Sequence, residues 1–494
     1  MTGVKIARPP VQDAPEARTN VVLPLLDAPW NTAVRLAAQA ELVHTGRVSR
    51  YLQESDEMTS KNSLRYHRRT DAFAGDPMHA AAGLAASGRH DEYVLYEDAA
   101  HWTYAGGVLA EIYADADGIH LRGVAEEDLP WDDRPFERVQ ALLRALPVDG
   151  WHAYGWAAFE LHHACAHGTA RGDGRYLHLV VPRTEVRIRA GQAHLRSVDP
   201  DDLEATSAVL SRREVPDRSA AAPIAVREYG AADYKDRAQR AVDLINSTAI
   251  EKIILSRKIP VERGVDFVGT YLTGRAGNRP ARSFLLDLGG VQAAGFCPEI
   301  VVQVDTDRHV TVRPLAGTRA LTGDREEDAR LRADLVGDPK EVYEHAVSVK
   351  QACEAVSAVC ASVVVEEFMA VRERGSVQHL GSTITGELAP DRSVWDALMA
   401  VFPSVTASGI PREEACAAIR DLETQPRRLY SGAVLSIDQD GTFDSGLVLR
   451  GVYREHGATW LQAGAGIIGQ STPDREFEET CEKLDSVARF VVHS

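Results

Sequence analysis

The clearest structural signal in the chain is DPKEVYEHAVSVKQACEAVSAVC, residues 338–360. Asp338 can cap a helix, and Pro339 suits the first helical position because the N–H that it lacks would be unbonded there. From Val342 to Cys360 apolar residues recur at intervals of three or four, which is the spacing of one helix face. The segment therefore predicts a long helix that buries a single apolar stripe.

Paired glutamates lie off that stripe, and the predicted C-terminal helix repeats the pattern. Glu341 and Glu344 are three residues apart, as are Glu476 and Glu479. Mg²⁺ prefers oxygen ligands, so two such pairs on separate helices could hold one ion. The alternative is that Glu341 completes a helix cap while Glu479 makes an ordinary surface pair with Lys483, four residues further on. Spacing alone leaves both interpretations open.

Charge and composition limit the classes of function. The 494 residues include 55 Lys and Arg against 72 Asp and Glu, a formal net charge of −17. A protein that binds duplex nucleic acid or an anionic membrane needs a basic surface, so both classes are excluded. No apolar run approaches the ~20 residues of a membrane span, and the six cysteines are scattered without a CxxC pair. We therefore expect a cytoplasmic protein with free thiols.

The chain divides into two regions of different character. Residues 1–90 are predicted to form an N-terminal extension that is partly disordered and partly helical. Helical spacing is found over 31–53 and 79–86, and the basic residues of 61–69 are expected to form a solvated connector. Residues 91–494 mix short strand-like runs with helices, too irregularly for a βαβ repeat, which favours an α+β fold.

Ten motifs link the second region to a known family. They are, in order, IEKIILSRKIPV (251–262), GFCPEIV (295–301), RPLAGTRAL (313–321), DPKEVYEH (338–345), GSVQHLGSTI (375–384), FPSVTASGIPR (402–412), RRLYSGAVL (427–435), LVLRGVY (447–453), LQAGAGII (461–468) and PDREFEETCEKL (473–484). The series resembles the chorismate-utilising enzymes, which include anthranilate synthase component I, aminodeoxychorismate synthases, isochorismate synthases and salicylate synthases. It is most similar to the salicylate synthases of siderophore pathways. The resemblance implies one large α+β domain over 91–494, with two layers of antiparallel sheet wrapped by helices and the active site between them.

The resemblance assigns the paired glutamates to a Mg²⁺ site. Glu344 and Glu479 match the family's direct Mg²⁺ ligands, and Glu341 and Glu476 match the acidic residues beside them. The ion would hold the ring carboxylate of chorismate, which an acidic protein would otherwise repel.

The resemblance also implies an acid–base pair. Lys252 matches the family's general base, which would activate water for attack at ring carbon 2. Glu299 matches the general acid, which would protonate the hydroxyl that leaves carbon 4 and so give isochorismate. A base must be neutral and an acid must hold its proton, so both side chains need sheltered positions. Loss of pyruvate from isochorismate then gives salicylate.

Eight further residues match substrate-binding positions in the family. Arg450 and Tyr430 would hold the carboxylate of the enolpyruvyl arm, for which a guanidinium offers two-pronged donors. The others are Gly464 and Lys483 for the ring carboxylate, Gly317 and Thr318 for the pocket floor, and His379 and Thr406 at the wall of the site. Elimination of pyruvate depends on such positioning, because the arm must fold over the ring.

One position bears on the choice among the subfamilies. Aminodeoxychorismate synthases typically carry a nucleophilic lysine where this chain has Ala316, and alanine leaves room for water instead. No segment resembles a glutaminase, so no glutaminase subunit is expected, and a salicylate-activating ligase is the partner enzyme that a siderophore pathway implies. Three alternatives stay open: an isochorismate synthase that releases its product, an amine-forming relative, and a catalytically silent chorismate-binding protein.

A cluster of His162, His163, Cys165 and His167 has the composition of a transition-metal site. Contiguous ligands seldom surround one ion, so we favour the interpretation without a metal.

Overall fold

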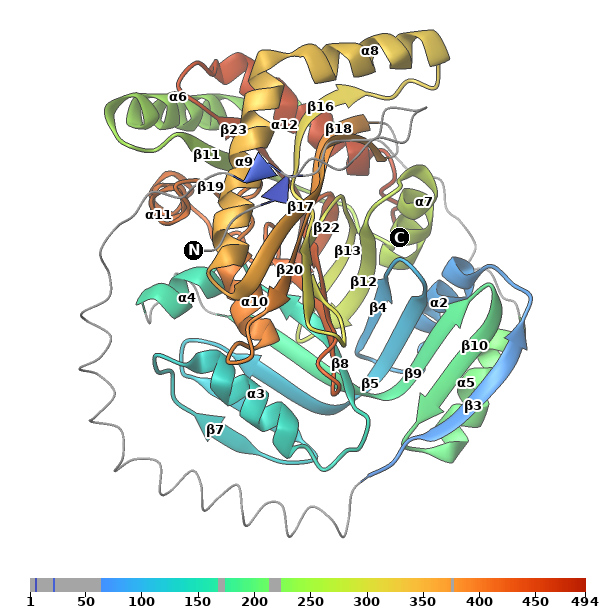
Figure 1. Ribbon diagram of the computed structural model, residues 1–494. Coiled ribbons are helices and arrows are strands. Elements are labelled where there is room, and N and C mark those ends of the chain that lie inside the picture. Colours follow the sequence, from blue (N-terminus) through green and yellow to red (C-terminus); the bar gives the residue numbers. More distant parts are fainter. Residues whose placement is uncertain (1–4, 7–20, 23–63, 168–173, 213–223, 375–376) are drawn as a thin grey trace, which may run out of the picture.

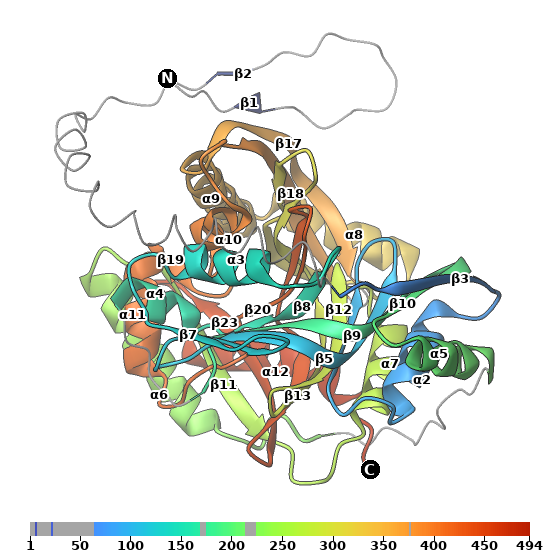
Figure 2. The same ribbon diagram turned by 90° about the horizontal axis from the view of Figure 1, so that it is seen from below.

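Strands of the protein form an antiparallel sheet that folds into two layers (Figures 1 and 2). The computed structural model describes residues 5–6, 21–22, 64–167, 174–212, 224–374 and 377–494. The helix predicted over 31–53 lies outside these residues. Pairing between the named strands is antiparallel except where β1 (Lys5–Ile6) meets β17 (Cys360–Arg374). The predicted α+β class with antiparallel sheet layers is confirmed.

The first layer holds seven strands that hydrogen-bond side by side. In spatial order they are β19 (Gly409–Ile410), β11 (Lys252–Pro260), β23 (Ala458–Ile467), β22 (Gly451–Glu455), β13 (Val291–Cys297), β12 (Arg282–Leu288) and β4 (Tyr93–Glu97).

The second layer runs in spatial order through β8 (His152–Ala157), β20 (Ala433–Asp438), β21 (Phe443–Leu447), β14 (Ile300–Val304), β15 (His309–Val312), β18 (Val377–Leu388) and β17. Three short strands extend it: β16 (Leu315–Ala320) on β18, β1 on β17, and β2 (Val21–Val22) on β1.

Two long strands join the layers. β5 (Trp102–Ala114) pairs with β4 of the first layer, and β9 (Leu177–Arg189) pairs with both β5 and β8 of the second. The remaining strands, β3 (His67–Phe73), β10 (Gly191–Ser197), β6 (Ile119–Gly123) and β7 (Glu127–Leu129), continue from this pair.

Side chains alternate between the two faces of each strand, so the hydrophobic core has an inner part between the two layers and two outer parts beneath the helices. On β12, Phe284 and Leu286 belong to the cluster that also takes Trp156 and Val434 from the second layer, whereas Leu285 belongs to the cluster on the other side of its strand. Successive strand side chains point to opposite faces, so each layer buries both faces. Helices must therefore cover the outer surfaces.

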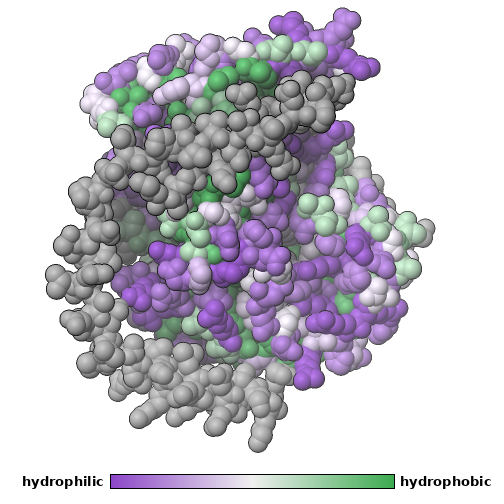
Figure 3. All heavy atoms as spheres, in the orientation of Figure 1, coloured by the Kyte–Doolittle hydropathy of each residue, from purple (hydrophilic) through white to green (hydrophobic). Residues whose placement is uncertain are grey.

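Two groups of helices supply this cover. On the first layer lie α2 (Pro77–Ala86), α5 (Pro200–Arg212), α6 (Ala231–Ser247), α7 (Phe267–Gly277), α11 (Arg412–Leu422) and α12 (Pro473–Ala488). On the second lie α3 (Pro135–Ala145), α4 (Leu161–His167), α9 (Pro339–Ser357) and α10 (Val394–Val401). α8 (Arg325–Gly337) buries little besides Leu335, and its outer end is hydrophilic in Figure 3.

The two glutamate-bearing helices form as their sequences predict. The Asp338 side chain caps α9 by accepting from the backbone N–H of Lys340, and Val349, Cys353 and Val356 are buried along one stripe. The same spacing buries one face of α12. The helix predicted over 79–86 is confirmed by α2.

The connector predicted over 61–69 is wrong from residue 67 onward, where β3 begins. β3 pairs with β10 at the margin of the sheet, and α2 packs into the core of the first layer. The proposed division of the chain at residue 91 stays a prediction. Among the described residues, no helix is long and apolar enough to cross a membrane.

Candidate active site

Lys252 begins β11, and its ammonium group contacts α9. Its side chain is only 6% exposed and makes an ion pair with Glu344 of α9. β23 can pass close to the Lys252 side chain because it has a glycine at position 466, where a Cβ atom would lie 3.0 Å from the Lys252 Cε atom. The predicted base and one predicted metal ligand are therefore neighbours, from segments 92 residues apart.

Glu299 occupies the turn between β13 and β14 and is buried. Its carboxylate accepts hydrogen bonds from the backbone N–H of Leu315 at 3.0 Å, from the Ser404 hydroxyl at 3.2 Å and from the Thr406 hydroxyl. Burial raises the pKa of Glu299 to about 7, although these hydrogen bonds and the charge of Lys252 oppose the shift. A carboxyl with that pKa holds a proton part of the time at neutral pH, as a general acid must.

Three carboxylates from α9 and α12 influence one another. Burial favours the neutral form of Glu344, but the charge of Lys252 outweighs it, so the pKa of Glu344 is lowered. In the same way Lys483, at 2.7 Å, lowers the pKa of Glu479 against burial and the charge of Glu344. Burial and the charge of Glu479 raise the pKa of Glu476.

The fourth glutamate has a different environment. Glu341 accepts a hydrogen bond from Arg319 at 2.9 Å, and a Cβ atom at Gly317 would lie 3.0 Å from its Oε2 atom. It thus stands beside the pocket floor and is held there by an arginine.

A cation would suit the first three carboxylates. The Oε2 atom of Glu476 is buried without a hydrogen-bond partner among the described residues, and a buried oxygen of this kind is costly unless something binds it. No three His, Cys, Asp or Glu side chains in the described part of the chain are already arranged around a common point. Glu344 and Glu479 instead form ion pairs with Lys252 and Lys483, which supply the positive charge that balances these carboxylates.

Arg450, one of the two predicted arm-binding residues, is linked by contacts to the predicted wall and floor of the pocket. Arg450 has a left-handed backbone conformation with φ of 51° and donates to the Nε2 atom of His379 at 3.2 Å. The Nδ1 atom of His379 lies 3.2 Å from the Gly317 carbonyl and 3.0 Å from the Thr318 hydroxyl. Burial and the charge of Arg450 lower the pKa of His379 to about 3, so the ring is neutral and can accept from Arg450.

The other predicted substrate residues gather around β23. Tyr430 is buried, and its hydroxyl lies 3.1 Å from the position that a Cβ atom at Gly464 would take. Lys483 donates to the Gly464 carbonyl at 2.9 Å. Glycine is needed at this point because a side chain would also meet the Leu255 carbonyl at 2.9 Å.

Sequence reasoning missed an arginine that holds two parts of the site together. Arg427 is 1% exposed and pairs with Glu423 at 2.6 Å. Its guanidinium also donates to the carbonyls of Ile254 at 2.6 Å and Ala407 at 2.7 Å. These carbonyls belong to the strand of Lys252 and to the loop of Thr406. Arg427 begins the motif RRLYSGAVL, but nothing in the spacing of that motif indicates these bonds.

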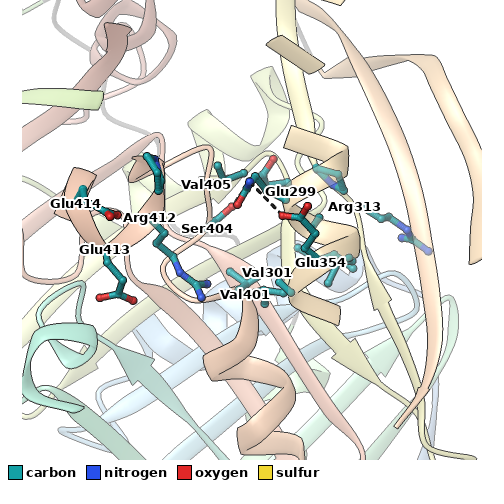
Figure 4. Close-up of a pocket in the computed structure, with 17 residues that line it drawn as sticks. Glu299, Val301, Arg313, Glu354, Val401, Ser404, Val405, Arg412, Glu413 and Glu414 are labelled. Atoms are coloured by element: carbon teal, nitrogen blue, oxygen red, sulfur yellow. Dashed lines mark hydrogen bonds between the residues drawn. The ribbon is translucent and has the colours of Figure 1, made fainter. Parts of the chain in front are cut away.

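A pocket of about 230 Å³ reaches Glu299 from the surface (Figure 4). It lies between α9 and the loop that leads from α10 to α11, and its lining includes Val301, Val405 and Arg412. Ser404, which bonds to Glu299, also lines it. None of the other predicted site residues lines it.

The histidine-rich segment is α4, outside this arrangement. His162 contacts Glu413 at 3.1 Å, and burial raises the pKa of Cys165 to about 12. The His167 side chain lies outside the described part. Among the described side chains of this segment, no three are arranged to hold a metal ion.

The chain matches the family model for chorismate binding enzymes over residues 91–489. It belongs to that family. It is therefore a chorismate-utilising enzyme. It is 40% identical to the salicylate synthase of Mycolicibacterium paratuberculosis over 435 residues, which cover 84% of this chain and 94% of the relative.

More distant relatives share parts of the chain or its fold. An anthranilate synthase component 1 from Haloarcula marismortui is 38% identical over 52% of this chain and 48% of its own length. The menaquinone-specific isochorismate synthase of Escherichia coli superimposes with a TM-score of 0.68 at 18% identity, covering 90% of this chain and 99% of that structure. The second likeness concerns the fold alone.

Proposed function

We propose that this enzyme is a salicylate synthase, which converts chorismate through isochorismate to salicylate and pyruvate. The observation that carries the proposal is Glu299, a buried carboxyl with a pKa of about 7 that shares the site with Lys252. Such a pair can supply and remove protons at one substrate. The extent of the likeness to a salicylate synthase supports the choice of product.

The first half-reaction uses the acid and the base on the same ring. Lys252 takes a proton from water as the oxygen bonds to ring carbon 2, and the ring double bond shifts. The hydroxyl on carbon 4 leaves as water with the proton of Glu299. Ala316 places no nucleophile in the site, so water can be the attacking group.

Mg²⁺ is the cofactor that the acidic side chains suit. Glu344 and Glu479 would hold it with Glu476 beside them, while Glu341 stays with Arg319. When bound, the ion would supply the positive charge that fixes the ring carboxylate of chorismate.

The second half-reaction depends on position more than on proton transfer. Arg450 and Tyr430 would hold the carboxylate of the enolpyruvyl arm over the ring, and Lys483 with Gly464 would hold the ring carboxylate. Such fixing favours elimination of pyruvate because the reacting atoms are kept together.

An assay with purified protein, chorismate and Mg²⁺ tests the proposal. We expect fluorescent salicylate together with an equal amount of pyruvate, measured through lactate dehydrogenase, and neither product from a Glu299→Gln preparation. Isochorismate that accumulates without pyruvate would make the chain an isochorismate synthase. A product that needs ammonium would indicate an amine-forming relative, and binding without turnover would indicate a catalytically silent protein.

The biological setting follows from the proposed product. Salicylate would pass to a salicylate-activating ligase in siderophore biosynthesis, and no glutaminase subunit would be needed because no ammonia is used. A cytoplasmic location fits this role and stays a prediction.

A further inference from the structure

Glu299 has to regain a proton in every catalytic cycle. In the proposed reaction it gives one proton to the hydroxyl that leaves carbon 4, while Lys252 takes one from the attacking water. Elimination of pyruvate, as proposed, does not restore either residue. Each turnover therefore leaves Glu299 one proton short and Lys252 with one in excess, so one proton must enter at Glu299 and one must leave from Lys252.

The pocket shown in Figure 4 gives the Glu299 carboxyl access to solvent. It has a volume of about 230 Å³, and Ser404 and the polar side chains of Arg313, Gln351 and Arg412 belong to its lining. Water enters a cavity of this size when polar groups are present to bind it, and several molecules fit. The residues proposed to bind the substrate do not line the pocket. A ligand on those residues therefore does not have to block this access.

Two hydroxyl groups connect the pocket to the carboxylate. Ser404 lines the pocket, and its hydroxyl donates to the Oε1 atom of Glu299 at 3.2 Å. The same hydroxyl lies 2.8 Å from that of Thr406, which also donates to Oε1. A hydroxyl both accepts and donates, so it can take a proton from one neighbour and pass its own to the next. The third partner, the backbone N–H of Leu315, only donates and cannot relay a proton.

We propose that this pocket is the entry path for the proton of Glu299 and that Ser404 is the residue that relays it. An acid of the medium gives a proton to water in the pocket, and the Ser404 oxygen accepts a proton from that water. The proton that Ser404 held moves to Oε1 of Glu299, directly or through Thr406. One O–H bond forms as another breaks at each step, so the hydroxyls end unchanged and the carboxyl is neutral again. The proposal rests on the proposed function, in which Glu299 is the general acid.

The competing explanation is that Ser404 only orients the carboxyl, and kinetics at varied concentrations of a small acid separate the two. We expect Ser404→Ala to lower kcat for chorismate consumption about tenfold, because delivery of the catalytic proton becomes limiting. Its solvent deuterium isotope effect on kcat should exceed that of the native enzyme. Imidazolium, which is an acid near neutrality and small enough for the pocket, should restore kcat as its concentration rises at constant pH and ionic strength.

A larger side chain in the pocket tests the path itself. Ala355 of α9 lines the pocket and is partly exposed, so Ala355→Phe should lower kcat and, combined with Ser404→Ala, prevent rescue by imidazolium. The matched control is Ala358→Phe, at the exposed C-cap of the same helix and outside the pocket lining, which should keep the native kcat. Should Ala355→Phe fail to fold, Gln351→Phe fills the same pocket from one turn earlier on α9.

A kcat of Ser404→Ala that does not respond to imidazolium, with a native isotope effect, would overturn the proposal. The orienting role predicts only a higher apparent pKa for the basic limb of the pH–rate profile, because the Ser404 hydrogen bond holds the pKa of Glu299 down. Chorismate consumption is measured, so the result is the same whether salicylate or isochorismate is formed. If instead Glu299→Gln keeps native activity, the failure lies in the proposed general acid and not in the relay alone.

Discussion

Arg450 donates to the Nε2 atom of His379 over 3.2 Å, while the Nδ1 atom of the same ring lies 3.2 Å from the Gly317 carbonyl. The imidazole can serve both partners only when it is neutral, with its proton on Nδ1. The low pKa of His379, caused by burial and by Arg450, keeps the ring neutral near pH 7. His379 is therefore a positioning residue for the arginine that is proposed to hold the substrate arm.

His379→Phe should raise the KM for chorismate about tenfold and change kcat less, because Arg450 loses its acceptor and is no longer held in place. His379→Gln, which keeps an acceptor, should have an intermediate effect. Steady-state kinetics on both variants and on the native enzyme provide the measurement. A native KM in folded His379→Phe would show that Arg450 needs no such support.

The pH–rate profile of the enzyme should have a basic limb near neutrality, set by the ionisation of Glu299. Its pKa of about 7 means that the proton needed for the leaving hydroxyl is lost as the pH rises above that value. The rate of salicylate formation should fall accordingly. Glu299→Gln should lower kcat by about 10² to 10⁴ at all pH values, since proton donation is lost. Glu354→Gln, at the exposed rim of the same pocket, is the control and should retain native activity and the same limb.

The same carboxyl links stability to pH. A carboxyl whose pKa is raised in the folded state stabilises the fold at low pH, and this contribution is lost between about pH 4.5 and 7 as the proton dissociates. From pH 5 to 8 the native protein should lose about 2 kcal/mol relative to Glu299→Gln. Denaturant unfolding of both proteins at the two pH values measures this difference. Parallel pH profiles for the two proteins would mean that Glu299 is not protonated in the fold.

Removal of divalent metal should abolish turnover, and added Mg²⁺ should restore it, because the carboxylates of α9 and α12 need a counter-charge before they can hold another anion. Glu479→Gln should raise the Mg²⁺ concentration for half-maximal activity by about tenfold or more. Glu482→Gln on the same helix, whose exposed side chain pairs with Arg475, should leave that concentration unchanged. Full activity after chelation would argue against a metal.

The helices and the sheet class could be predicted from the sequence because their signals are local. Asp338 and Pro339 mark the start of α9, and apolar spacing gives the buried faces of α9 and α12. β3 was missed because its residues, HRRTDAF, are largely exposed and basic. That composition is typical of a strand near the margin of a sheet, where charge discourages pairing with other chains.

The motifs identified the site residues, but the contacts between these residues could not be predicted from the sequence. The ion pair of Lys252 with Glu344 joins a strand to a helix far along the chain, and no spacing rule specifies such a pair. Arg427 lies within the motif RRLYSGAVL, but its bonds to the Ile254 and Ala407 carbonyls join segments far apart in the chain, which only the fold reveals.

Arg427 should be among the most sensitive positions for stability. Arg427→Met leaves the Glu423 carboxylate buried without its counter-charge and deprives the Ile254 and Ala407 carbonyls of their donor. Removal of one partner of a buried ion pair costs about 3–5 kcal/mol, so the urea midpoint should fall clearly. Any folded fraction should also be less active, because these carbonyls fix the strand of Lys252 and the loop of Thr406.

Two comparisons test the physical reason for that loss. Arg475→Met removes the arginine of an exposed pair with Glu482 and should cost no more than about 1 kcal/mol. Adding Glu423→Leu to Arg427→Met removes the uncompensated charge and should recover part of the stability, although the Ser256 N–H then loses its acceptor in Glu423. If Arg427→Met alone unfolds at the native urea midpoint, the guanidinium does not stabilise the junction between β11 and the loop of Thr406.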